Sequence, residues 1–203
     1  GFDACHMGFI EVLAELNGSC DYVIASPDLE PGAGWNYATW PIYFANTQSR
    51  SALDLGESII QSYSETYEHY AYTALSLYDM SRLNTTLSAL DTYSSSLLNR
   101  TNNWWDDWGT GYSNYGQTDY DAVRNSAHIY SYSDTIDIYQ LAESAPATGD
   151  SDLKSAIDSL VAASWHHPTG HAGANGLAIH FGDPTLSDTR SYTITYTNLN
   201  RFN

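Results

Sequence analysis

The first 37 residues of the chain combine a cysteine-bearing turn, a helix, a strand and a turn rich in glycine and proline. The helix is predicted over residues 7–16, because Phe9, Leu13 and Leu16 share one face and Gly18 can stop it. A strand is predicted over 21–26, and the turn 30–37 follows it. This order places the thiol of Cys5 at a turn between a strand end and a helix.

A thiol in front of a helix is favoured as a thiolate, because unpaired N–H groups and the helix dipole face it. The same groups can stabilise an oxyanion. Cys5 is therefore a candidate nucleophile, and the alternative is a small buried apolar residue. The second cysteine, Cys20, is expected to pack as an apolar residue rather than to form a disulfide with Cys5.

The rest of the chain alternates helical and strand-like segments without a long linker or an internal repeat. We expect a single domain over residues 1–203 with an α/β sheet. The predicted helices cover 53–67, 81–98, 126–144 and 151–165, the last capped by Ser151. The predicted strands cover 71–78 and 176–181.

The composition is strongly acidic, with 7 Lys and Arg against 24 Asp and Glu and a net charge of −17. This charge argues against nucleic acid and anionic membranes as partners, since both need basic side chains. It keeps a protein soluble or attracts basic peptides. The apolar runs are too interrupted for a membrane span, so no membrane insertion is expected.

Two further clusters suggest ligands without a matching motif. Residues 102–120 mix tryptophans with carboxylates, and this loop is either an aromatic-pinned surface loop, a glycan platform or a calcium site, although it lacks an EF-hand pattern. His166, His167 and His171 are separated by Pro168 and Gly170 and have no Cys partner, so zinc is not expected. We predict no metal site in the chain and no required cofactor, with calcium as an open possibility.

The chain resembles the clostripain-like cysteine peptidases, which are related to caspases, gingipains and legumains. The resemblance is carried by blocks near the amino terminus and by weaker echoes near 73–79, 137–139 and 174–181, which together span nearly the whole chain. The specific blocks are Asp3-Ala4-Cys5, Met7, Glu11-Val12, Ala14-Glu15-Leu16, Asp21-Tyr22, Ala25-Ser26 and Pro31-Gly32-x-Gly34-Trp35-x-Tyr37.

The resemblance implies a caspase-like α/β/α sandwich with a central, mainly parallel sheet and the active site at the carboxyl ends of its strands. Cys5 would attack the peptide carbonyl, and its backbone N–H would donate to the oxyanion. The dyad His of such peptidases lies in an upstream His-Gly motif. Nothing before Cys5 can supply that motif, so we expect a missing amino-terminal segment to carry it and this piece alone to be inactive.

The resemblance also implies cleavage of peptide or protein substrates after Arg or Lys. Asp3 occupies one acidic position of the expected pocket, whereas Ala33 stands where the family often has a second acid. Asp28 and Glu30 are close in sequence and are the candidates to compensate. Together with Trp35 in the same turn, these residues form the predicted substrate-binding set of Asp3, Asp28, Glu30 and Trp35.

The alternative is a catalytically inactive peptidase homologue that serves as a binding or adhesion module, with Trp104, Trp105 and Trp108 on a glycan-binding surface. Three glycosylation sequons begin at Asn17, Asn84 and Asn99 and are compatible with an extracellular or cell-envelope location. The sequons do not separate the two functions. The retained Cys5 motif favours the enzyme, because a binding module gains nothing from a thiol there.

Overall fold

The computed structural model describes residues 1–100, 124–131 and 135–181. Its main sheet has three strands in the order β1-β2-β4, namely β1 (Tyr22–Ala25), β2 (Ala74–Asp79) and β4 (Val161–His166). Both strand pairs are antiparallel: Tyr22 lies opposite Asp79, and Leu75 lies opposite Trp165. The register of β2 against β4 shifts between Leu77 and Tyr78.

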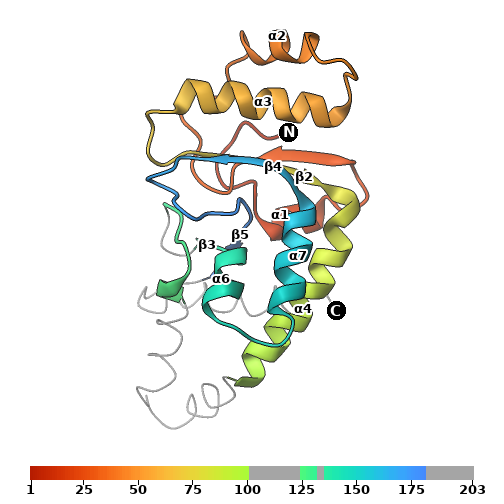
Figure 1. Ribbon diagram of the computed structural model, residues 1–203, viewed down its shortest axis with the longest axis vertical. Helices are drawn as coiled ribbons and strands as arrows, with labels where there is room; N and C mark the ends of the chain where they lie inside the picture. The colour runs from red at the N-terminus through yellow and green to blue at the C-terminus, as the bar shows by residue number, and fades with distance from the viewer. Residues whose placement is uncertain (101–123, 132–134, 182–203) are drawn as a thin grey trace.

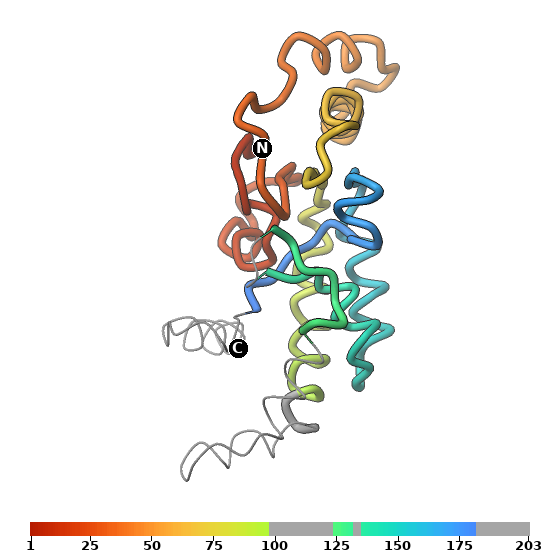
Figure 2. Tube along the Cα trace, turned by 90° about the vertical axis from the view of Figure 1, so that its left-hand side faces the viewer, coloured from red at the N-terminus to blue at the C-terminus, as the bar shows by residue number. Residues whose placement is uncertain are grey.

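Helices cover both faces of this sheet (Figure 1). On one face α3 packs against the strands, and α2 lies on its far side; the other face is covered by α1, α4, α6 and α7. The helices are α1 (Ile10–Glu15), α2 (Trp40–Ala45), α3 (Ala52–Tyr67), α4 (Leu83–Arg100), α6 (Ile138–Ser144) and α7 (Asp150–Leu160), and a 3-10 turn, η1 (Met80–Arg82), leads into α4. The result is an elongated molecule with α2 and α3 at one end (Figure 2).

Strand β2 separates two hydrophobic cores. Alternate side chains of a strand point to opposite faces, so Leu75 and Leu77 join the α3 side while Tyr78 joins the other side. The α3 core also contains Ile24, Trp35, Ile59, Ile60, Tyr63 and Tyr67. The larger core contains, among others, Ile10, Leu13, Val23, Leu83, Leu90, Leu153, Ile157 and Leu160.

A second, two-stranded sheet pairs β3 (Thr135–Asp137) with β5 (Ala178–His180) in antiparallel fashion. Phe9 forms an isolated parallel bridge with Ala178, and Ala178 N donates to Gly8 O at 3.1 Å. This contact attaches the second sheet to the segment that carries Cys5.

The α/β class is confirmed, but the prediction of a mainly parallel sheet is wrong for the described residues, where every strand pair is antiparallel. The parallel sheet was implied by the family resemblance, and the apolar run of β2 does not distinguish parallel from antiparallel pairing. A near-continuous apolar strand is typical of a parallel sheet because helices cover both of its faces. Here β2 is covered on both faces within an antiparallel sheet, so the same pattern arises without parallel pairing.

Two predicted helices are partly wrong. Within residues 126–144, a short helical segment ends at Ser126, β3 occupies 135–137, and α6 covers Ile138–Ser144 with Asp137 as its N-cap through Gln140 N. The helix predicted over 151–165 begins at Asp150, after Gly149 at the N-cap position, and ends at Leu160. The residues after Leu160 leave the helix because they pair with β2 as β4.

Candidate active site

A tight turn at the amino terminus carries Cys5 and lies along the continuation of β1. Three backbone bonds attach it: Phe2 N donates to Ile24 O at 2.9 Å, His6 N to Asp28 O at 2.9 Å, and Gly8 N to Ser26 O at 2.7 Å. We call residues 1–8 the nucleophile turn and 26–30 the support segment. The support segment follows the carboxyl end of β1, where the sequence predicts the site.

The Cys5 thiol is half-buried and receives a backbone donor. Glu30 N lies 3.2 Å from Cys5 Sγ, so the support segment presents an N–H group to the sulfur. The predicted helix N-terminus does not supply this donor, because α1 begins only at Ile10. His6 has a left-handed φ of 57°, and the N–H groups of His6 and Gly8 bond to the support segment, which delays the helix.

Asp3 holds the glycine-rich turn against the nucleophile turn. Its Oδ2 accepts hydrogen bonds from Trp35 N and from the Tyr37 hydroxyl, both at 3.0 Å. Gly34 has a φ of 67°, and a Cβ there would lie 2.5 Å from Asp3 Oδ2. The turn therefore needs glycine for its backbone conformation and for the close approach of the carboxylate.

Glu30 is a half-buried carboxyl in the same place. Trp35 Nε1 donates to its Oε1 at 3.3 Å. Burial is the largest influence on this group and, with the nearby charge of Asp3, it raises the pKa to about 7 against the opposing effect of the Tyr63 and Trp35 donors. Asp3, Glu30 and Trp35 of the predicted substrate-binding set thus lie together beside Cys5.

The fourth predicted residue, Asp28, differs because its side chain is fully buried. Ser131 N lies 3.1 Å from both carboxylate oxygens, Ser131 Oγ donates to Oδ2 at 2.7 Å, and His171 Nε2 lies 3.0 Å from Oδ2. Burial alone would raise the pKa of Asp28, but hydrogen bonds from His171 and Ser131 hold it below its ordinary value. Its substrate-binding role stays a prediction, and its carboxylate faces the protein interior.

The sequence did not indicate that histidines lie behind the support segment. His171 Nδ1 is 3.0 Å from His128 Nε2, so Asp28, His171 and His128 form a continuous series. Burial and the neighbouring His171 lower the pKa of His128 to about 4, which keeps its imidazole neutral at ordinary pH. No motif marks this group, since 103 and 143 residues separate Asp28 from Ser131 and His171.

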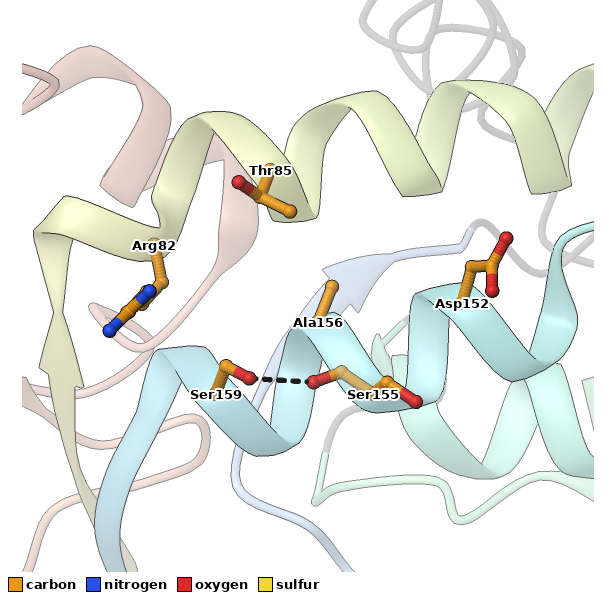
Figure 3. Close-up of a pocket in the computed structure, with 6 residues that line it drawn as sticks. All are labelled: Arg82, Thr85, Asp152, Ser155, Ala156 and Ser159. Carbon is orange, nitrogen blue, oxygen red and sulfur yellow. Dashed lines mark hydrogen bonds between the residues drawn. The ribbon is translucent and has the colours of Figure 1, made fainter.

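Three other features of the chain were considered as ligand sites, namely a metal centre, the tryptophan-rich loop and a surface hollow. Among the described residues, no three His, Cys, Asp or Glu side chains are arranged to hold a metal ion, and the tryptophan-rich loop considered for calcium or glycan lies outside them. A hollow of about 260 Å³ lies between α7 and the segment formed by η1 and α4, and it is lined by Arg82, Thr85, Asp152, Ser155, Ala156 and Ser159 (Figure 3). It contains none of the predicted site residues. No described helix has the length and apolar character needed to cross a membrane.

Both cysteines are free thiols. The expectation that Cys20 packs as an apolar residue is wrong, since its side chain is exposed in the turn between α1 and β1. Helix α1 ends at Glu15, before it could carry Cys20 into the core. The exposed Cys20 is a useful internal reference for the reactivity of Cys5.

The model of the clostripain family, Peptidase_C11, matches residues 1–198. A C11 protease from Parabacteroides distasonis, solved as an inactive zymogen, is 17% identical with a TM-score of 0.67, over 98% of this chain and 57% of that one. A B. fragilis cysteine protease is 20% identical with a TM-score of 0.65, over 98% and 84%. A secreted C11 cysteine protease from Bacteroides thetaiotaomicron, in complex with an irreversible peptide inhibitor, is 16% identical with a TM-score of 0.63, over 99% and 57%.

The chain belongs to the clostripain family, because the family model covers nearly all of it. The solved C11 proteases share its fold. A comparison with the curated proteins gave no match. The chain spans 57% of the Parabacteroides structure and of the secreted Bacteroides one.

Proposed function

We propose that this chain carries the nucleophile of a cysteine endopeptidase. The observation that carries the proposal is the contact of Glu30 N with Cys5 Sγ, within a turn that three backbone bonds hold against the end of β1. This N–H group fixes the position of the sulfur that would attack the substrate. Membership of the clostripain family supports the same chemistry.

In the proposed reaction, a histidine takes the proton of the Cys5 thiol, Cys5 Sγ bonds to the carbonyl carbon of the scissile peptide, and the carbonyl oxygen becomes an oxyanion. The C–N bond then breaks and the amine leaves with a proton from a histidine. Water hydrolyses the resulting thioester and restores the thiol. We propose that this histidine lies in a segment ahead of Gly1, as the family resemblance implies, and that the complete domain is a caspase-like sandwich.

We further propose a preference for Arg or Lys on the amino side of the cleaved bond. Among the described residues, both hydrogen bonds donated to Asp3 use Oδ2, so Oδ1 of this exposed carboxylate is proposed to accept from a cation. Glu30 lies beside it, and an incoming cation would favour its ionised form. The acidic surface charge of the whole chain also attracts basic peptides.

We propose an extracellular or cell-envelope location. It is supported by the sequons and by the similarity to a protease that is described as secreted. Detection of the protein by mass spectrometry in culture supernatant and envelope fractions tests the location, with a cytoplasmic enzyme as the lysis control. Recovery only with the cytoplasmic control would contradict it.

The test of the nucleophile uses the full-length protein and a peptidyl acyloxymethyl ketone that ends in arginine. We expect labelling of Cys5 and not of Cys20, although Cys20 is the more exposed thiol. Cys5→Ala should lose both labelling and peptide hydrolysis, whereas Cys20→Ala should keep both. Equal labelling of the two thiols, or hydrolysis that survives in Cys5→Ala, would refute the assignment.

A further inference from the structure

The position of Cys5 depends on the support segment 26–30. His6 N and Gly8 N, which follow Cys5 in the nucleophile turn, donate to Asp28 O and Ser26 O. Glu30 N, from the same segment, is the donor on Cys5 Sγ. The support segment therefore fixes both the turn that carries the thiol and the N–H donor on its sulfur.

The support segment is in turn fixed through the Asp28 carboxylate. This carboxylate is fully buried and takes its partners from two distant parts of the chain, Ser131 and His171. Within the segment, Ser26 Oγ also contacts Asp28 N at 3.0 Å, which closes a local turn. Asp28 thus ties the segment beneath Cys5 to two distant parts of the fold.

His171 is built to present a fixed imidazole to Asp28. Its side chain is 1% exposed, and its ring contacts Asp28 through Nε2 and His128 through Nδ1, each at 3.0 Å. Its backbone is fixed as well, since His171 N donates to His167 O and Ala174 N donates to His171 O. A buried carboxylate without such a donor would be costly, so the pair forms one unit.

We propose that Asp28 and His171 are positioning residues for the Cys5 nucleophile. Their buried contact fixes the support segment and thereby holds the Glu30 N–H donor on the sulfur. This inference rests on the proposed role of Cys5 and deepens it, because it identifies what holds the N–H donor on a thiol that α1 does not directly follow. Neither residue touches the reacting atoms.

The test measures alkylation of Cys5 by iodoacetamide at pH 7 in the full-length protein, with Cys20 of the same molecules as the internal reference. Peptide mass spectrometry gives the ratio of the two rates. We expect His171→Ala to lower the ratio about tenfold, the size expected when a hydrogen bond to a charged sulfur is lost. His171→Gln should largely restore it, because the glutamine amide can replace the Nε2 donor to Asp28.

Two further variants separate positioning from stability. Asp28→Asn removes the carboxylate charge at nearly constant shape and should also lower the ratio of alkylation rates. This variant keeps the proposal testable if His171→Ala does not fold. Asp137→Asn removes another fully buried carboxylate, one that caps α6 and contacts Asn175 and Tyr130 but not the support segment. It should cost stability and leave the ratio unchanged.

An unchanged or higher ratio in folded His171→Ala and Asp28→Asn would overturn the inference, and so would equal losses in Asp137→Asn. The measurement needs no substrate, so it stands apart from the proposed function. If wild type hydrolyses peptides while Cys5 is alkylated at the normal rate in His171→Ala and Asp28→Asn, only the positioning role is refuted. A lowered ratio in a protein without hydrolytic activity would refute only the peptidase.

Discussion

At the scale of single residues, Asp3 combines two roles. It anchors the glycine-rich turn through Trp35 N and Tyr37, and it is the proposed acceptor for a basic substrate side chain. Asp3→Asn in the full-length enzyme should lower kcat/KM for an arginine peptide at least about tenfold, and far less for an uncharged analogue, because a charged partner in the pocket is lost. A peptide library varied at that position measures both.

The control for this experiment is Tyr37→Phe, which removes one donor to Asp3 and keeps its charge. It should reduce kcat/KM for both peptides to a similar, smaller extent. Ala33→Asp should strengthen the basic preference by adding a second carboxylate. A wild-type preference for uncharged residues that neither Asp3→Asn nor Ala33→Asp alters would rule out the basic pocket.

The predicted site residues that the structure brings together all lie close together along the chain. Cys5, Asp3, Glu30 and Trp35 fall within the first 35 residues, and a motif of that length can be recognised without the fold. The contact of Asp28 with His171 could not be predicted, because it depends on how β4 returns beside β2 and delivers the loop after it. Asp28 was consequently predicted to face the substrate, and the structure buries it.

At the scale of secondary structure, periodicity predicted the helix at 53–67 and failed at 161–165. The capping box of Ser51 with Asp54 marks the start of α3, whereas Val161 to Trp165 fit either a helix or a strand by sequence alone. Pairing with β2 decides the second case. Tertiary contacts of this kind override a local preference, which is why the helix end was misplaced.

Gly56 within α3 shows the same competition. A Cβ at this position would lie 2.5 Å from Leu77 Cδ2 on β2, so the glycine lets the helix approach the sheet. Gly56→Ala gains about 1 kcal/mol of helix propensity and costs about 1–3 kcal/mol through overpacking. We expect a net loss in the free energy of unfolding, measured by urea denaturation. In a Leu77→Ala background, Gly56→Ala should cost less stability than it does in wild type, because the atoms that its Cβ meets have been removed. A Gly56→Ala single variant that is more stable than wild type would contradict the close contact.

At the scale of the whole molecule, two buried carboxyls make stability depend on pH. Burial raises the pKa of both Glu11 and Glu30 from 4.5 to about 7. The folded state therefore binds more protons than the unfolded state between these values, so stability falls as pH rises from about 4.5 to 7. Each group contributes a loss of up to about 3 kcal/mol, since one pKa unit corresponds to about 1.4 kcal/mol.

Glu30→Gln mimics the protonated carboxyl and should remove this loss at one site. We expect wild type and variant to be similarly stable at pH 5, and the variant to be more stable at pH 8 by up to about 3 kcal/mol. Chemical denaturation of both proteins at several pH values measures this difference. The lowered pKa of His128 adds stability as pH rises, but it does so equally in both proteins and cancels in the comparison. The exposed Glu57→Gln is the control, and an equal gain there would point to net charge instead.

We expect the position of β2 to determine which backbone amides are protected from solvent exchange. β2 pairs on both edges, and residues 74–78 are at most 2% exposed between the two cores. Solvent reaches an amide only when its hydrogen bond opens, so the amides of Leu75 and Leu77 exchange with deuterium only when both cores separate. Exchange at the nucleophile turn needs no such event, so the reactive end of the protein can fluctuate while the strand behind it stays protected.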